Sequence, residues 1–301
     1  MRYSSVYLVL SIFLLGACSQ EKSSTETETS ETIEAKEDNP LVGSWELVSY
    51  MDDDVGDWAS HPETVIYQKH ITPTHFTWYR FDSDQDQLVG IGGGTYEYAD
   101  GVYTENIKFF MPPGSNELGQ AIPFTVEMKD GKWYHTGYAK SMAIDETSGE
   151  VVMADSSKIE EIWQRVSEQP NTYEPGVSGA WNLITYREGD APTAMEYPDF
   201  IKYMKLITPT HFVWVKYNGE GDEVFEAGGG TYELTADKYT ESIQMMYPPG
   251  SETVGSDIEF TYSFDSGRWN HMGYVNRVNV NKEGTPTEDL LIDEVWVRMQ
   301  K

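Results

Sequence analysis

The chain is short of several residue types, and each shortage excludes a class of protein. Among its 301 residues there is one cysteine, Cys18, so neither an internal disulfide nor a cysteine-based metal site can form. Lys and Arg number 21 against 50 Asp and Glu, and the net charge of -29 makes nucleic acid or an anionic membrane surface a poor partner. An anionic ligand would gain no long-range attraction and would have to be held by local Lys and Arg side chains.

The N-terminal segment predicts a lipid anchor. Arg2 supplies a positive charge, residues 6–15 form an apolar run too short to span a bilayer, and Gly16-Ala17 precedes Cys18. This stretch resembles the lipobox of bacterial lipoproteins, which implies a signal peptide at 1–17 and lipidation (palmitate) of Cys18. Ser19 resembles outer-membrane sorting, so we expect a surface-exposed protein of the cell outer membrane that touches the membrane through this anchor only. The alternative is an ordinary signal peptide with a chance cysteine.

An internal repeat dominates the rest of the chain. The run 71–76 (ITPTHF) returns unchanged at 207–212, and the run 92–97 (GGGTYE) returns at 228–233, both at an offset of 136 residues, as from 71 to 207. A period this long indicates tandem domains and not a solenoid. We expect a disordered, acidic tether at 18–40, one domain at 41–166, a linker at 167–176 and a second domain at 177–301.

Within each unit the pattern predicts β-strands, and helical periodicity is essentially absent. Alternating segments rich in Tyr, Trp, Val, Ile and Thr occur near 44–50, 65–71, 75–82, 88–98, 102–111, 122–129, 132–142 and 158–166. Eight short sequential strands fit an up-and-down barrel, which has no exposed sheet edge. The predicted fold is therefore all-β, with two tandem eight-stranded barrels. We interpret the glycine runs at 92–94 and 228–230 as bulges or close backbone approaches.

Residues at the two ends of each unit resemble those of a known family. Gly43-x-Trp45 on the first strand and Arg165 on the last resemble the lipocalin-like signature, and Gly179-x-Trp181 with Arg298 repeats it. In that family the Arg packs over the Trp and closes one end of the barrel. The resemblance implies two lipocalin-like (calycin-type) barrels in which these Trp and Arg residues are structural.

A narrower resemblance covers the strands between these ends. Lys69, the run 71–78, Gly93-Gly94-Thr95-Tyr96 and Tyr103-Thr104-Glu105 are similar to an uncharacterised lipocalin-like family. Its members are often lipoproteins of polysaccharide-degrading marine bacteria, which implies a role beside other proteins of polysaccharide degradation. The family name carries no activity, so the function has to come from the sites.

A carboxylate lies in the middle of an apolar strand face in both units. On the strand 102–111, Tyr103, Glu105, Ile107 and Phe109 alternate onto one face, and 239–245 repeats the pattern. Lys69 shares an apolar face of the strand 65–71 in the same way, as does Lys205 in the second unit. Because an unpaired buried carboxylate is costly, we predict a buried Lys69–Glu105 pair. Such a pair is either a packing device or the wall of a binding cavity.

Histidine is scarce, which makes its positions informative. Of the six, His75 and His135 recur in the second unit, whereas His61 and His70 do not, so the units differ and the first is favoured for any chemistry. His135 lies on an aromatic face and, we expect, near Glu105. The alternative is that these are hydrogen-bonded structural histidines.

The candidate catalytic residues follow from the chemistry that such a cavity could perform. Proton abstraction beside a uronate carboxylate needs a cation over the carboxylate, a base, and an acid for the leaving oxygen. Lys69 would be the cation, His75 or His135 the base, and Tyr138 or Tyr103 the acid. The set is compatible with elimination but is not diagnostic of it.

Aromatic side chains of the first unit would bind the substrate. Trp78, Trp133 and Tyr96 suit stacking on a sugar face, and Glu105 and His70 would add polar contacts. No cofactor or metal is expected, because the histidines lack zinc-site spacing. A Gly-x-Ser-x-Gly elbow for acyl transfer and the second carboxylate of a glycosidase are also missing.

Three functions remain open. The first is a carbon–oxygen lyase of the dehydratase type that acts on uronate-containing, algal-type oligosaccharides. The second is a non-catalytic module that binds an acidic oligosaccharide or another small ligand in one or both barrels. The third is a structural accessory of a surface complex. We favour the first over the second, largely on the setting that the family resemblance implies.

Overall fold

The computed structural model describes residues 39–52, 54–144, 151–172, 176–189, 191–251, 253–275 and 290–301. The predicted signal peptide, Cys18 and most of the predicted tether lie outside these residues. Residues 39–301 form one compact unit. The regular elements of its described part are strands, as the all-β prediction requires, and no helix there is long and apolar enough to cross a membrane.

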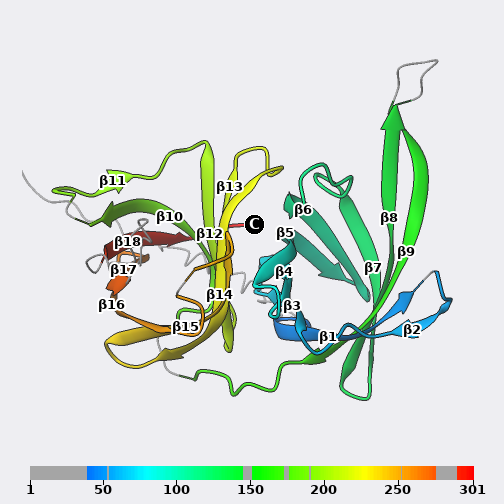
Figure 1. The fold of residues 1–301 in the computed structure, drawn as a ribbon, viewed down its shortest axis with the longest axis horizontal. Coiled ribbons are helices and arrows are strands. Elements are labelled where there is room, and N and C mark those ends of the chain that lie inside the picture. Colours follow the sequence, from blue (N-terminus) through cyan, green and yellow to red (C-terminus); the bar gives the residue numbers. More distant parts are fainter. Residues whose placement is uncertain are drawn as a thin grey trace, which may run out of the picture. The chain divides into compact units, whose positions relative to one another are not determined.

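The first sheet closes on itself into a barrel (Figure 1). Its neighbouring strands are antiparallel in the order β2-β1-β3-β4-β5-β6-β7-β8-β9, and β1 also pairs with β9. Closure satisfies the backbone groups that an open sheet would leave at its edges. The strands are β1 (Gly43–Asp52), β2 (Asp57–Ala59), β3 (Val65–Ile71), β4 (His75–Asp82), β5 (Gln87–Ala99), β6 (Val102–Met111), β7 (Ala121–Lys129), β8 (Lys132–Ile144) and β9 (Val151–Arg165).

The second sheet repeats this topology. Its order is β11-β10-β12-β13-β14-β15-β16-β17-β18, and β10 pairs with β18 to close it. The two tandem eight-stranded barrels predicted from the sequence are thus confirmed. The strands are β10 (Gly179–Glu188), β11 (Met195–Glu196), β12 (Ile201–Ile207), β13 (His211–Asn218), β14 (Val224–Leu234), β15 (Lys238–Tyr247), β16 (Asp257–Asp265), β17 (Arg268–Val275) and β18 (Leu290–Arg298).

Two short strands, β2 and β11, were not predicted. β2 pairs with the far end of β1, which shifts register against β9 between Leu47 and Ser49. β10 has the same irregularity between Leu183 and Thr185. Each first strand keeps its pairing with the last strand beyond the bulge, and it pairs with three strands in all.

The glycine runs mark bends where backbones approach closely, as predicted. The pairing of β5 with β6 shifts register between Gly93 and Gly94. A Cβ on Gly93 would lie 2.6 Å from the carbonyl oxygen of Phe76, and one on Gly92 would lie 2.8 Å from the Trp78 ring. Only a residue without a side chain fits between these neighbours.

The predicted closure of each barrel by an arginine over a tryptophan is confirmed. The guanidinium carbon of Arg165 lies 3.9 Å from the Trp45 ring centroid, and Arg298 lies 4.2 Å from that of Trp181. A Cβ on Gly43 would come within 2.1 Å of Arg165 Nη1, which explains the glycine of the signature. The buried Trp45 and the cation over it close this end of the barrel.

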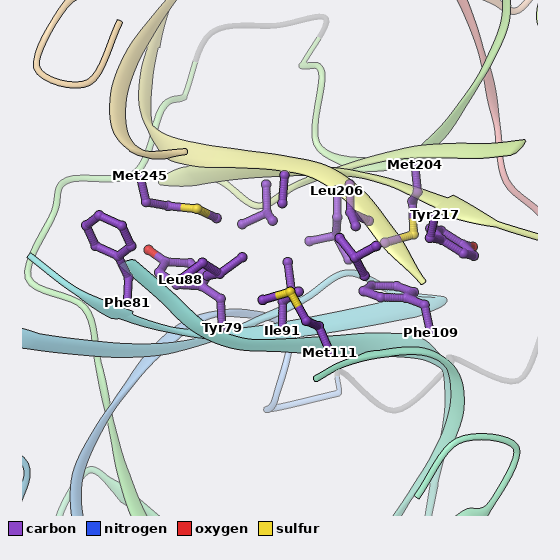
Figure 2. Close-up of a cluster of buried hydrophobic side chains, with 14 residues drawn as sticks. Tyr79, Phe81, Leu88, Ile91, Phe109, Met111, Met204, Leu206, Tyr217 and Met245 are labelled. Carbon is purple, nitrogen blue, oxygen red and sulfur yellow. The ribbon is translucent and has the colours of Figure 1, made fainter. Parts of the chain in front are cut away.

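An apolar cluster joins the outer faces of the two barrels (Figure 2). Tyr79, Ile91 and Phe109 from the first barrel pack against Leu206 and other apolar side chains from the second. Each of these four is at most 1 % exposed. Alternation alone would assign outward residues such as Tyr79 and Leu206 to solvent. It would also face Phe109 inward with Ile107, which is wrong, because the bulge at Lys108 shifts the register and Phe109 packs against the second barrel.

Candidate functional site

The second barrel contains a cavity of about 490 Å³. Its wall includes the aromatic side chains of Tyr186, Tyr197, Tyr203 and Trp214. Its polar lining includes Lys205 from β12, Glu241 from β15, His271 from β17 and Glu294 from β18. The volume and the mixture of aromatic walls with a few convergent polar groups are those of a small-molecule site.

A buried ion pair forms part of the polar lining. Lys205 Nζ lies 2.8 Å from Glu241 Oε1, and the two side chains are 3 % and 4 % exposed. The ammonium group is also surrounded by aromatic rings, with centroids at 5.0 Å for Trp296 and 5.6 Å for Trp269. The ring faces and the carboxylate together compensate the cost of burying the lysine charge.

A histidine and a second carboxylate lie beside this pair. Glu294 Oε2 accepts hydrogen bonds from His271 Nδ1 at 3.2 Å and from Trp296 Nε1 at 3.1 Å. Burial lowers the pKa of His271, so the ring is neutral and its Nδ1 proton is the one donated. Burial alone would raise the pKa of Glu294, but the His271 hydrogen bond and the charge of Lys205 bring it below the ordinary value, so this carboxylate is ionised.

The other cations that line the cavity are paired as well. Lys216 Nζ lies 2.7 Å from Glu226 Oε2, and Arg187 Nη2 lies 2.8 Å from Asp293 Oδ2. Together with Lys205, these are the three lysine and arginine side chains of the lining. Each therefore already has a carboxylate partner before any ligand enters.

The first barrel holds the same arrangement of polar groups. The predicted Lys69–Glu105 pair is confirmed, with 2.8 Å between Nζ and Oε1. His135, expected near Glu105, is held instead by Glu161, whose Oε2 lies 3.0 Å from His135 Nδ1 and 3.0 Å from Trp163 Nε1. The lysine–glutamate and histidine–glutamate pairs thus belong to the repeated unit and not to one barrel.

Glu161 and Glu294 are the residues that sequence reasoning missed. A signal was present, because Glu161, Trp163 and Arg165 alternate on one face of the last strand, and Glu294-x-Trp296-x-Arg298 repeats them. The offset changes there from 136 to 133, as from 161 to 294, because the preceding loops differ in length. The alignment that pairs Arg165 with Arg298 also pairs these two carboxylates, so the signal was within reach of the sequence.

Most of the residues predicted for the first site come together inside the first barrel. Tyr103 and Trp133 are fully buried, and the Tyr103 ring lies 5.6 Å from the Trp133 ring and 5.9 Å from that of His135. Tyr96 packs 5.1 Å from Tyr103, and its hydroxyl donates to the Thr72 carbonyl at 2.7 Å. The interior side chains that meet here are Lys69, Trp78, Tyr96, Tyr103, Glu105, Trp133 and His135.

Three predicted residues lie apart from this group. Tyr138 is 53 % exposed on the outer face of β8. His70 follows the inward Lys69, so it faces out of the barrel, where its ring lies 5.1 Å from that of His211 in the second barrel. His75 is buried at the start of β4 beside the Thr74 hydroxyl, and burial with the charge of Lys301 lowers its pKa to about 4.

The first barrel was favoured from the sequence for any chemistry, whereas the cavity described above lies in the second. The candidate site of the second barrel is this aromatic cavity with its buried polar network. No group of three His, Cys, Asp or Glu side chains within the described residues is placed to hold a metal ion.

Comparison with known proteins identifies a family without an assigned activity. No curated protein matches the chain. Among solved structures, the chain is similar to a Trp-176-Ala mutant of the vaccine antigen Transferrin Binding Protein B from Haemophilus parasuis Hp5, at 5% sequence identity over 87% of this chain and 77% of that one. The TM-score of 0.23 is too low for the match to carry an argument. The family model described as Domain of unknown function (DUF4488) matches residues 40–175 and again 176–301, so the chain belongs to this family and carries its domain twice.

Proposed function

We propose that the chain is a binding protein that holds one small organic ligand in its second barrel. The observation that carries this proposal is the cavity of about 490 Å³, walled by aromatic rings and lined by a few fixed polar groups. Pockets of this size bury most of the surface of a small organic molecule. The hydrogen-bonded Glu294 and the paired Lys205 supply orientation without movement of the barrel.

The charges of the lining favour binding over elimination from a uronate. An elimination site needs a cation free to cover the substrate carboxylate. Lys205, Lys216 and Arg187 already hold Glu241, Glu226 and Asp293. A uronate would have to displace one of these carboxylates and would meet the ionised Glu294 as well.

One observation keeps the lyase as a second candidate. His271 is neutral and oriented through Nδ1 by Glu294, and its Nε2 has no hydrogen-bond partner among the described residues. A histidine held in this way is the usual form of a general base. Incubation with uronate oligosaccharides and measurement of the ultraviolet absorbance of unsaturated products tests it, and no rise across a panel of such substrates would reject it.

The cellular setting is proposed from the N-terminal residues. The resemblance of residues 15–18 to a lipobox supports a lipid anchor at Cys18, and Ser19 supports the outer membrane. The resemblance to lipoproteins of marine polysaccharide-degrading bacteria supports a carbohydrate-related ligand and a surface complex with other degrading proteins. In this setting the second barrel would capture a small molecule close to the cell surface.

A cavity-filling variant locates and tests the binding site. Titration calorimetry with neutral oligosaccharides, uronate oligosaccharides and phenylalkyl compounds should find at least one ligand that binds once per chain. Ile258 lines the cavity, and Ile258→Trp should abolish that binding. Ile122 has the same position in the first barrel, opposite Glu105 as Ile258 is opposite Glu241, so Ile122→Trp is the matched control.

Both variants add bulk to a barrel interior and should lower stability by about 1–3 kcal/mol, which thermal unfolding measures. Equal loss of ligand affinity in both variants, or undiminished binding in Ile258→Trp, would contradict a site in the second barrel. Failure of the whole panel to bind would contradict the proposed function itself.

A further inference from the structure

The buried polar network of the second barrel carries one negative charge in excess. The charges of Lys205 and Glu241 compensate each other at 2.8 Å. Glu294 is ionised, but its two hydrogen-bond donors, His271 and Trp296, are both neutral. Since Lys205 is already paired, the network lacks a second cation to match the second carboxylate.

Glu294 also retains an unused acceptor. Its Oε2 takes both hydrogen bonds, so Oε1 has no hydrogen-bond partner in the part of the chain that the structure describes. The side chain is 10 % exposed and belongs to the lining of the cavity. A carboxylate this buried is stabilised by every further donor that reaches it, most of all by a charged one.

The cavity wall presents an unbroken row of aromatic rings next to this carboxylate. The ring centroids of Tyr186 and Tyr197 are 5.5 Å apart, those of Tyr197 and Tyr203 are 5.7 Å apart, and those of Tyr203 and Trp214 are 5.7 Å apart. The faces of such rings carry negative electrostatic potential and attract cations. Glu294 lines the same cavity as these four rings.

The protein already places one of its own ammonium groups against this row. Lys216 Nζ lies 4.8 Å from the Tyr203 ring centroid and 6.0 Å from that of Trp214, while it pairs with Glu226 at 2.7 Å. The combination of ring faces with the partly exposed carboxylate of Glu226 is thus suited to a primary ammonium. An anionic ligand would instead face Glu226, Glu241 and Glu294 with no cation free.

From these charges and contacts we propose that the second barrel binds an organic ligand that bears a protonated primary amine. The ammonium group donates to Glu294 Oε1, and the apolar body of the ligand packs along the row from Tyr186 to Trp214. A primary ammonium has three donors and no acceptor, which matches two unpartnered acceptors of the lining, Glu294 Oε1 and His271 Nε2. The inference rests on the proposed function, since it names the ligand class of the same cavity.

The first barrel is less suited to such a ligand, although it repeats the buried network. Glu226 is the cross-strand partner of Lys216 in the second barrel, whereas the equivalent partner of Arg80 in the first barrel is Gly90. The carboxylate of Glu226 is therefore specific to the second barrel. We expect one amine per chain and not two.

Three ligands with one body and different head groups test the proposal. Titration calorimetry at neutral pH compares phenylbutylamine, phenylbutanol and phenylbutanoate, which differ only in a cationic, neutral or anionic end. The amine should bind at least about tenfold more tightly than the alcohol, as a charge-assisted hydrogen bond predicts, and the acid should bind most weakly. Glu294→Gln should bring the affinity for the amine down to that for the alcohol, with the alcohol unchanged.

Two further variants separate the local contact from the general attraction of a chain with net charge -29 for cations. Glu233→Gln removes the same charge from an exposed position on β14 and should leave the preference for the amine intact. Glu226→Gln, in which the native side chain is 39 % exposed, should weaken the amine several-fold while it keeps the fold. If Glu294→Gln does not fold, the affinity of Glu226→Gln for the amine tests the proposal in its place.

Each outcome separates the ligand class from the proposed function. Equal affinity for the amine and the alcohol in the native chain would overturn the amine proposal and leave a binding barrel intact. A preference for the amine that Glu233→Gln reduces as much as Glu294→Gln would also overturn it, because the attraction would then be general. If none of the three ligands binds but an oligosaccharide does, the ligand class is wrong, and if nothing binds, the proposed function fails too.

Discussion

Removing the lysine of the first buried ion pair should destabilise the protein strongly. In Lys69→Met, Glu105 would keep its burial, at 5 % side-chain exposure, and would lose the ammonium group 2.8 Å away. Breaking a buried pair by removing one partner costs about 3–5 kcal/mol, because the remaining charge is uncompensated. Burial already raises the pKa of Glu105 in the presence of Lys69, so without it the carboxyl would be neutralised at further cost.

Removing both Lys69 and Glu105 should lower the free energy of unfolding far less than removing Lys69 alone. In Lys69→Met with Glu105→Leu, apolar side chains occupy a space whose walls are already apolar, since rings of Tyr103, Trp133 and Trp163 lie 4.9–5.8 Å from the native Nζ. Apolar replacements of buried pairs are often neutral, so the double variant should lie within about 1 kcal/mol of the native protein. Since Glu105→Leu alone also breaks the pair at a cost of about 3–5 kcal/mol, the coupling energy between the two positions would be roughly 5 kcal/mol or more, above the usual range for neighbouring residues.

Urea unfolding followed by tryptophan fluorescence measures all four members of the cycle. The loss in Lys69→Met should shrink as the pH is lowered, because a carboxyl whose pKa is raised by folding binds its proton more readily in the folded state. A loss under about 1 kcal/mol in the single variant, or single effects that simply add, would refute the reasoning. The same cycle at Lys205 and Glu241 should give a smaller loss, because these side chains line a cavity that water can enter.

The remaining predictions concern an interface, a bend and the anchor. His211 contacts His70, and burial lowers the pKa of His211 to about 4 from an ordinary 6.5. The unfolded state therefore takes up the proton first, and the free energy of unfolding falls as the pH drops from about 6.5 to about 4. His211→Gln should flatten this pH dependence, and an unchanged slope would count against the prediction. Gly93→Ala should lower the free energy of unfolding by about 2 kcal/mol or more, because its Cβ would lie 2.6 Å from a carbonyl oxygen. Gly219→Ala is the control, since the nearest atom to its Cβ would lie at 3.5 Å, and it should unfold at an almost unchanged urea concentration. Cys18→Ala should move the protein from the membrane to the soluble fraction and abolish labelling with radioactive fatty acid; retention in the membrane would rule out this thiol as the anchor.

Local patterns were sufficient to predict the strands of each barrel. Alternation of apolar and polar residues repeats every two positions, and this period depends only on the backbone geometry of a strand. Two units with the same pattern, such as 71–76 and 207–212, reinforce each other. β2 was not predicted because it has only 3 residues, too few for an alternating pattern to stand out.

The candidate site was predicted in part by the same alternation. It placed Lys69 and Glu105 on inward faces, and their pair follows because both charges need a partner there. The same alternation faces Tyr138 away from His135, and His70 away from Lys69, so these two could have been separated from the group. Glu161 was missed although the alignment of Arg165 with Arg298 already pairs it with Glu294 on the same strand face.

By itself, the sequence determined the tandem all-β architecture and the buried Lys69–Glu105 pair, because both depend on strand parity. The Trp–Arg closures were implied by the family resemblance. Tertiary structure alone decided that outward residues such as Tyr79 and Leu206 are buried between the barrels, as in Figure 2. It also decided that the second barrel holds the described cavity. Alternation says which residues share a face, but not what covers that face or how much space eight strands of side chains leave between them.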